Sequence, residues 1–252
     1  MSNAVEWLST GGVERRLAAD QAANVLLSKY RQRWESIVPI ELHRLAASLN
    51  CTVSTVQEVE GGARLLPIAG GFEVLVSAEL PVAKYRMAIA HELAHTLFYS
   101  VEHDLPTRVL EPSRKEEHFC FDVARRILAP DWLIADVRRF HFAEPKDLFD
   151  CLTKTFKLSK STAARVMLED YELAVGVAGR WCRINGRWEL DRGRAFASPC
   201  LKPKDRKLLR DAAKRWLCET VPPAAPYHII GLSESSGTAM FVCVADANAP
   251  PR

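Results

Sequence analysis

The sequence predicts an α+β fold: a helix-rich N-terminal core around a small antiparallel sheet, then a pair of helices and a small α+β domain. Three observations predict it. Apolar residues repeat with the helical period over much of the first 170 residues. The glycine pairs Gly61-Gly62 and Gly70-Gly71 separate short runs typical of strands. Beyond Gly176, two strand-like runs flank Asn185-Gly186, and a basic helix and two further strands follow.

The first elements are predicted to be two helices and three strands. Residues 13–37 and 39–50 have amphipathic helical patterns. The first of these helices is expected to turn four larger residues inward: Leu17, Val25, Leu26 and Tyr30. Residues 51–59, 63–69 and 72–77 are short runs typical of strands, and the first is rich in Val and Thr. We expect the strand Gly71–Ser77 to be an edge to which an extended peptide can add.

Residues 85–98 predict a buried helix that carries the pattern His-Glu-x-x-His. Its other residues are almost all apolar, which is typical of a core helix. His91 and His95 are one helical turn apart, so both imidazoles can reach the same metal ion. Glu92 reaches the same cavity as a carboxylate that is not a ligand, where it can take a proton from water. The alternative is that two histidines occur in a core helix by chance.

A loop at residues 100–114 leads to a second helix, which supplies a third candidate ligand. Apolar residues repeat there at helical spacing: Phe121, Ala124, Ile127 and Leu128. Glu117 lies four residues before Phe121, so it is expected to extend this inward face, where an unpaired carboxylate is costly. Two histidines, one glutamate and an open position are typical of catalytic zinc, although such a site also accepts Mn²⁺. The alternative makes Glu117 a solvated charge next to residues 114–116.

These two helices resemble those of the ImmA/IrrE-type zinc metallopeptidases, a family that includes peptidases associated with CBASS anti-phage operons. Residues 85–90 are similar to the basic, aromatic and small apolar run before the family's first histidine. Four residues of the second helix fall at the family's spacings: Glu117, Cys120, Ala124 and Pro130. The resemblance covers roughly residues 15–170. It implies a zincin-like core that binds Zn²⁺ and cleaves a helix-turn-helix transcriptional repressor, which derepresses stress or anti-phage genes.

Applied to this sequence, the resemblance implies that His91, His95 and Glu117 are the metal ligands and that Glu92 is the catalytic base. One departure from the family's pattern is Phe121, which stands where Asn or Asp is usual. That polar residue would be a hydrogen-bond partner for a ligand histidine, and Asp122 could replace it. A shift of register would instead make His118 the third ligand. The spacing from Glu117 to Pro130 favours Glu117.

Residues 147–170 have a helix-turn-helix-like pattern that follows a further helix at 131–140. Ser159 or Ser161 is placed to cap its second helix. Four residues would face DNA if that helix were a recognition helix: Lys160, Ser161, Thr162 and Arg165. The segment has no basic excess, so packing against the peptidase core is the favoured interpretation.

The region after residue 175 is basic and carries interleaved aromatic residues. Residues 176–215 contain twelve Arg or Lys and four Asp or Glu, a charge of +8, whereas the whole chain has a net charge of +3. Such asymmetry indicates an anionic partner. The aromatic residues among these charges are Trp181, Trp188, Phe196 and Trp216. Aromatic platforms in a cationic groove suit single-stranded DNA, which is our candidate activator. The alternative places the aromatic residues in the core.

The predicted organisation is a metallopeptidase domain at 1–142, a helix-turn-helix-like segment at 143–175 and a GAF-like sensor domain, as some family members carry, at 176–252. No run approaches the ~18 apolar residues of a membrane span, and residues 1–10 do not resemble a signal peptide. We therefore expect a cytoplasmic protein with no membrane partner. Seven cysteines cannot all pair internally. A second, structural zinc site is not expected in the last domain, because its cysteines include no Cys-x-x-Cys pair. These cysteines are Cys182, Cys200, Cys218 and Cys243.

A second hypothesis makes the protein a non-catalytic, zinc-containing regulator that binds a repressor, or that binds DNA through residues 147–170. A structural zinc site normally has four protein ligands and needs no carboxylate beside the metal. The presence of Glu92 in the motif therefore favours catalysis.

Overall fold

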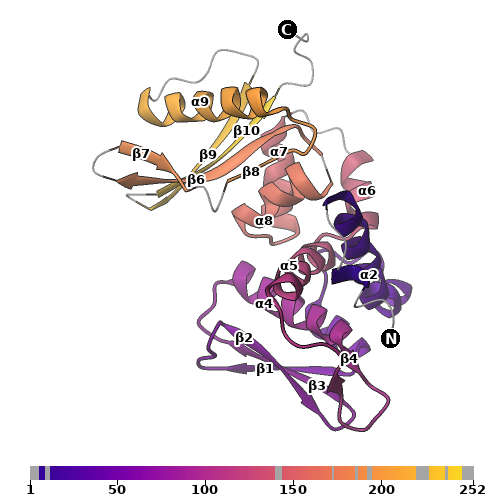
Figure 1. The fold of residues 1–252 in the computed structure, drawn as a ribbon. Helices are drawn as coiled ribbons and strands as arrows, with labels where there is room; N and C mark the ends of the chain where they lie inside the picture. Colours follow the sequence, from indigo (N-terminus) through magenta and orange to yellow (C-terminus); the bar gives the residue numbers. More distant parts are fainter. Residues whose placement is uncertain are drawn as a thin grey trace. The chain divides into compact units, whose positions relative to one another are not determined.

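The computed structural model describes residues 6–8, 12–139, 144–171, 173–184, 187–191, 195–219, 227–235 and 238–245. The fold is mixed α+β with small sheets, as predicted (Figure 1). The chain divides into two compact units. The first comprises Met1–Arg139 and Lys154–Leu158, and the second comprises Phe140–Thr153 and Ser159–Arg252. Most of the helical segment expected at 143–175 therefore belongs with the C-terminal residues.

The sheet of the first unit has three strands: β1 (Cys51–Val56), β2 (Ala63–Ile68) and β3 (Gly71–Ser77). Their order is β1-β3-β2, with β1 parallel and β2 antiparallel to β3. The sheet is thus mixed rather than purely antiparallel, and the prediction that β3 is an edge strand is wrong. Phe72, Val74 and Val76 of β3 are all buried, as expected for a central strand.

Helices cover one face of this sheet in successive layers. The helices of the first unit are α2 (Gly12–Trp34), α3 (Leu42–Ser48), α4 (Val82–His95), α5 (Arg114–Leu128) and α6 (Asp131–Arg139). Figure 1 shows α4 between the sheet and α5, and α2 packs against α5. This arrangement makes α4 a core helix, as its apolar sequence predicts.

The inward face of α2 is only partly the predicted one. Leu26 and Tyr30 are buried, but Leu17 and Val25 are exposed. Small residues fill much of the buried face: Ala18, Ala19, Ala22 and Ala23. Because alanines let two helices approach closely, the helix is rotated so that its alanines, and not all of its larger apolar residues, face the core.

A short hairpin replaces part of the loop predicted at residues 100–114. Strand β4 (Tyr99–Ser100) pairs antiparallel with β5 (Thr107–Arg108), and we call residues 99–108 the β4–β5 hairpin. The N–H of Gly70, in the β2–β3 turn, donates to the carbonyl of Asp104 over 2.7 Å. The hairpin is therefore tied to the sheet on one side and leads directly into α5 on the other.

The second unit begins with a helix pair and continues with a five-stranded sheet. The helices are α7 (Pro145–Asp150), extended by a π-helical turn (Cys151–Thr155) whose last two residues are grouped with the first unit, and α8 (Lys160–Arg165), extended by a second such turn (Val166–Asp170). Ser159 caps α8, since its hydroxyl accepts from the N–H of Thr162 over 3.1 Å. The helix-turn-helix-like order of elements is thus present.

The remaining elements follow the predicted strand–strand–helix–strand–strand order, with one additional short strand, β8, before the helix. They are β6 (Gly176–Ile184), β7 (Arg187–Leu190), β8 (Phe196–Ala197), α9 (Pro203–Glu219), β9 (Tyr227–Ser235) and β10 (Thr238–Ala245). The strand order is β7-β6-β10-β9, with β8 beside β6. The Asn185-Gly186 turn lies outside the described residues.

The two aromatic residues of the predicted platform whose side chains the structure describes, Trp181 and Phe196, are buried. Trp181 is buried in a core cluster with Val177, Leu209 and Ala213. Phe196 is buried as well, with the guanidinium of Arg165 4.7 Å from its ring centroid. Neither ring is free to stack on a base. The side chains of Trp188 and Trp216 lie outside what the structure describes.

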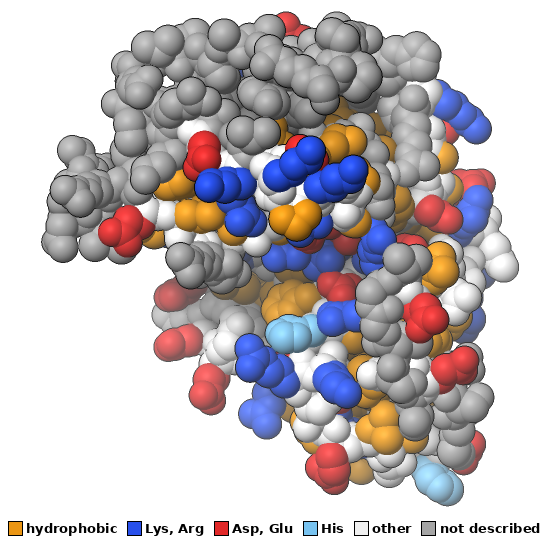
Figure 2. Space-filling view, turned by 45° about the horizontal axis from the view of Figure 1, so that its top comes forward, with side chains coloured by type: hydrophobic (Ala, Val, Ile, Leu, Met, Phe, Trp, Pro, Cys, Tyr) orange, Lys and Arg blue, Asp and Glu red, His pale blue; other side chains and the backbone are white. Residues whose placement is uncertain are grey.

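Three features of the composition can be compared with the structure: the basic charge, the cysteines and the hydropathy. Basic side chains at the start of α9 are exposed: Lys202, Lys204 and Lys207. Figure 2 shows Lys and Arg side chains gathered in several places on the face in view. Among the described residues, five cysteines are outside any disulfide: Cys51, Cys120, Cys151, Cys182 and Cys200. None of the helices in the described ranges is long and apolar enough to cross a membrane.

The ion pair between Arg126 of α5 and Asp20 of α2 should contribute strongly to stability. Arg126 is almost fully buried, and its Nε–H donates to Asp20. Because Asp20→Ala removes the carboxylate and leaves the buried guanidinium, we expect the free energy of unfolding in urea to fall by about 3 kcal/mol. The matched control is Asp136→Ala, which breaks an exposed pair with Arg139. It should cost less than about 1 kcal/mol. Equal losses in the two variants would contradict this account.

Candidate metal centre

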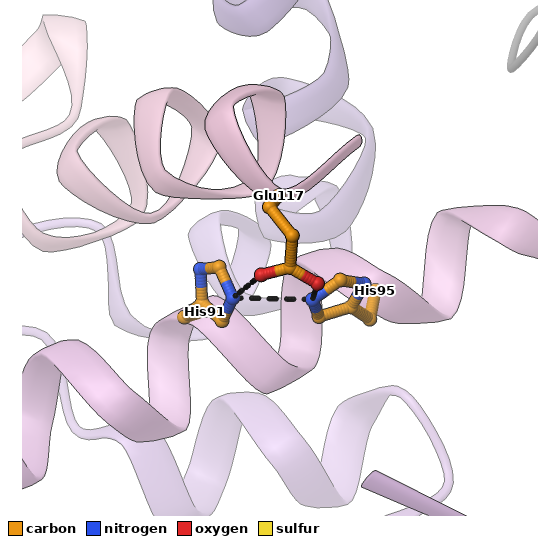
Figure 3. Close-up of side chains that lie close together, drawn as sticks. All are labelled: His91, His95 and Glu117. Atoms are coloured by element: carbon orange, nitrogen blue, oxygen red, sulfur yellow. Dashed lines mark hydrogen bonds and ion pairs between the residues drawn. The ribbon is translucent and has the colours of Figure 1, made fainter. Parts of the chain in front are cut away.

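Helices α4 and α5 bring three side chains to one point (Figure 3). His91 and His95 lie one turn apart on α4 and face Glu117 in the first turn of α5. The two Nε2 atoms are 3.1 Å apart. One carboxylate oxygen of Glu117 is 3.2 Å from Nε2 of His91, and the other is 3.4 Å from Nε2 of His95. The three residues that the sequence predicts as ligands thus converge.

The spacing of these donor atoms fits a tetrahedral zinc ion. Zinc lies about 2.0–2.1 Å from imidazole nitrogen and carboxylate oxygen, so tetrahedral donors are separated by about 3.3 Å. The two Nε2 atoms are 3.1 Å apart, and they lie 3.2 and 3.4 Å from different oxygens of Glu117, so all three separations are close to that value. Glu117 remains half exposed, with 51% of its side chain accessible to solvent, so the centre can be reached from outside its unit. The donor set can therefore hold a metal ion with a position left open.

The protonation state of His91 also suits a ligand. Burial and the neighbouring His95 together lower the pKa of His91 to about 4, against the opposing effect of Glu117. At neutral pH the imidazole of His91 is therefore uncharged, and its lone pair is available to a cation. Its ring packs on Phe121, with 4.1 Å between the ring centroids.

The predicted inward face of α5 is correct at its C-terminal end and wrong at its N-terminal end. Ala124, Ile127 and Leu128 are buried, but Phe121 is 45% exposed. Glu117, four residues earlier, is exposed with it. The buried stripe begins instead with Glu116, Phe119, Cys120 and Val123. Glu117 and Phe121 lie at the edge of the buried face of α5, so the carboxylate can face the histidines without being enclosed.

Glu116 is the site residue that the sequence analysis missed. It is 1% exposed, and its Oε1 is 2.7 Å from Nδ1 of His95. Nη2 of Arg108 donates to both oxygens of the carboxylate over 2.6 Å. Burial alone would raise the pKa of Glu116, but the hydrogen bonds from His95 and Arg108 outweigh it and hold the pKa below its usual value. The available signal was the spacing of Glu116 to Phe119 and Cys120.

Two alternatives raised by the sequence are not supported by the geometry. Asp122 forms ion pairs with Arg15 over 2.6 Å and with Arg125 over 2.7 Å, so the expectation that it supports a ligand histidine is wrong. His118 is exposed and belongs to neither of the donor groups found among the described residues.

Glu92 lies between the donor group and strand β2. The backbone N–H of Leu65 on β2 is near enough to its carboxylate to help lower the pKa of Glu92. Burial raises the pKa of Glu92, and Glu117 raises it too, while His95 and the Leu65 N–H lower it. A carboxylate with a raised pKa next to two histidines that could hold a metal ion is suited to accept and return a proton.

A second donor group shares His95 but is a poorer metal site. It combines Nδ1 of His95 with Glu116 and with Cys120, whose Sγ is 3.5 Å from that nitrogen. Arg108 already occupies both oxygens of Glu116. Burial holds the pKa of the Cys120 thiol well above its usual value, so the thiolate that a metal needs is disfavoured.

Comparisons with known proteins yield a likeness of fold. No model of a known protein family matches the sequence, and no curated protein matches it. A solved structure called a Mycobacterium tuberculosis transcriptional regulator superposes with a TM-score of 0.53. The match has 11% sequence identity and covers 92% of this chain and 78% of that one. The two proteins therefore share an overall fold across most of their length, and nothing more follows from the likeness itself.

We predict that the chain, stripped of metal and titrated against a chromophoric zinc chelator, takes up one zinc ion. Glu117→Ala should weaken zinc binding by more than about 100-fold, because the loss of a ligand should exceed the 10–100-fold cost of altering the groups around one. His118→Ala is the matched control, since it tests the neighbouring position that a shift of register would make the ligand. Tight binding by Glu117→Ala together with loss of binding by His118→Ala would reverse the assignment.

Proposed function

We propose that the protein is a zinc-dependent endopeptidase with a zincin-like core, of the kind found in the ImmA/IrrE-type metallopeptidases. The observation that carries this proposal is the convergence of His91, His95 and Glu117 at tetrahedral spacing, with Glu92 adjacent but outside the donor set. A structural zinc site has no use for that extra carboxylate. The resemblance of both helices to that family supports the same activity.

Each residue of the centre has a distinct part in the proposed reaction. Bound zinc supplies Lewis-acid polarisation of the scissile carbonyl and lowers the pKa of water at the site to about 7. His91 and His95 bind through Nε2, and Glu117 binds through its carboxylate. Glu92 accepts the proton of the attacking water and delivers it to the nitrogen of the leaving amine as the peptide bond breaks.

The outer strand β2 is the proposed binding edge for the substrate backbone, in place of the central strand β3. It is an outer strand of its sheet, and Leu65 on it contacts Glu92. A peptide added along β2 would satisfy its own backbone groups by strand pairing, largely independently of its side chains. Its scissile bond would then pass close to the catalytic carboxylate.

The proposed substrate is a helix-turn-helix transcriptional repressor, whose cleavage derepresses stress or anti-phage genes. Two points support a regulatory setting: the resemblance to the peptidase family and the fold shared with a protein called a transcriptional regulator. The proposed activator is single-stranded DNA bound by the second unit. The support for this activator is the +8 charge of residues 176–215. Trp181 and Phe196 do not add to it, since both side chains are buried and cannot stack on bases.

A second candidate is a non-catalytic zinc-containing regulator in the cytoplasm that binds a repressor or DNA. The observation that favours it is the helix pair α7 and α8, together with the shared fold of the regulator. Helix α8, the capped second helix of this pair, is the type of element that enters a DNA groove. The two candidates differ in whether Glu92 is needed.

Zinc-loaded protein incubated with the helix-turn-helix regulator encoded beside its gene should release discrete fragments. Glu92→Gln should slow cleavage by about 10²–10⁴-fold, because it removes the proton acceptor. The same variant should still bind zinc, since Glu92 is not a donor. The fragments are measured by mass spectrometry, with and without single-stranded DNA.

The outcomes separate the candidates. Cleavage that needs both Glu92 and DNA supports the peptidase and the activator together. Cleavage that is independent of DNA supports the peptidase and removes the activator. A stable complex that wild-type protein does not cleave supports the non-catalytic regulator.

A further inference from the structure

Glu116 is a fully buried carboxylate that the proposed reaction does not use. It occupies the fourth position of a Ser-x-x-Glu sequence that begins at Ser113, the N-cap of α5. In a capping box, the serine hydroxyl accepts from the glutamate N–H, and the glutamate carboxylate accepts from the serine N–H. The first of these two hydrogen bonds is present, since the N–H of Glu116 donates to Oγ of Ser113 over 3.2 Å. The carboxylate instead contacts His95 and Arg108.

The contact with His95 determines how that imidazole can bind a metal. An ionised carboxylate can only accept, so the 2.7 Å contact requires the proton of His95 to be on Nδ1. Nε2 then has its lone pair free, and Nε2 is the atom that faces His91 and Glu117. A carboxylate that accepts from a ligand histidine fixes its tautomer and ring orientation and increases its basicity.

Arg108 holds this carboxylate in place. Its Nη2 reaches both oxygens of Glu116, and its Nε donates to the carbonyl of Leu110 over 3.0 Å. Its guanidinium carbon also lies 5.3 Å from the ring centroid of Tyr99. Arg108 and Tyr99 are paired across the β4–β5 hairpin. The cation that keeps Glu116 charged in the interior is therefore fixed by that hairpin.

The two histidines are supported differently. Nδ1 of His91 is buried and has no hydrogen-bond partner among the described residues. The ring of His91 is held by its packing on Phe121. His95 is thus the ligand whose tautomer and direction are set by a charged group.

We infer that Glu116, clamped by Arg108, is a positioning residue that fixes His95 for metal binding and couples the β4–β5 hairpin to the metal centre. This inference rests on the proposed zinc site, and it adds an ordered chain of contacts from Tyr99 through Arg108 and Glu116 to His95. The competing interpretation is that Arg108 and Glu116 form an ion pair that only stabilises the fold.

Two variants separate positioning from stability. Glu116→Gln keeps the shape of the side chain and removes its charge. The double variant Glu116→Leu/Arg108→Met replaces both charges with apolar groups, which commonly preserves or increases stability. We expect both folded proteins to bind zinc about 10–100-fold more weakly than wild type in competition with a chelator. Glu111→Gln changes an exposed glutamate just before α5 and should leave zinc affinity unchanged.

The results can overturn the inference in either of two ways. A double variant that folds and binds zinc as tightly as wild type would show that the ion pair is only structural. NMR of the metal-free wild-type imidazoles gives a second readout that depends on neither zinc nor a variant. It should place the proton of His95 on Nδ1, and a proton on Nε2 would refute the inference. Failure of wild-type protein to bind zinc, with His95 protonated on Nδ1, would instead refute the proposed function.

Discussion

The packing of α5 against α4 is the contact on which the rest of the first unit depends. Helix α4 lies between the sheet and α5, so its histidines reach a ligand on another element only where the two helices meet. Both helices bury small side chains, among them Ala90 and Ala94 on α4 and Cys120 and Ala124 on α5. Small side chains let helices approach closely, and the 3.2 and 3.4 Å separations between the Glu117 oxygens on α5 and the Nε2 atoms on α4 require such an approach.

Two adjacent glutamates at the start of α5 illustrate how one helical step changes the chemistry of a side chain. Successive residues on a helix differ by about 100° in direction. Glu116 therefore points into the core, at Nδ1 of His95, while Glu117 points along the rim, at Nε2 of both histidines. The buried carboxylate has a guanidinium as its partner, as a charge in the interior requires. The half-exposed carboxylate is free to serve a cation.

The sequence predicted the elements well and their environments less well. The His-x-x-x-His spacing identified two of the three residues that converge, because it rests on helical geometry alone. The third, Glu117, was identified by its inward position on the second helix and by its spacing to Pro130, which matches the family resemblance. The place of β3 in its sheet could not be predicted, since alternation in one strand does not reveal its pairing partners. The position of Phe121 depended on the rotation of α5, which packing with α4 decides.

The burial of particular charged and aromatic residues was the other feature that could not be predicted from the sequence. Glu116 stands in a run of charges and was not singled out by the sequence, although its partner Arg108 lies only eight residues away, on the β4–β5 hairpin. Trp181 stands among arginines, and the sequence left open whether it stacks on bases or lies in the core; the structure packs it against Leu209 and Ala213 of α9. In both cases a partner on another element, invisible to periodicity, determined the environment.

X-ray absorption at the zinc K-edge of zinc-loaded protein tests the central claim most directly. The account predicts only nitrogen and oxygen neighbours at about 2.0–2.1 Å, with the outer-shell signature of two imidazoles. A sulfur neighbour at about 2.3 Å would contradict it. Such a neighbour would point to a site that includes a cysteine such as Cys120, in place of His91, His95 and Glu117.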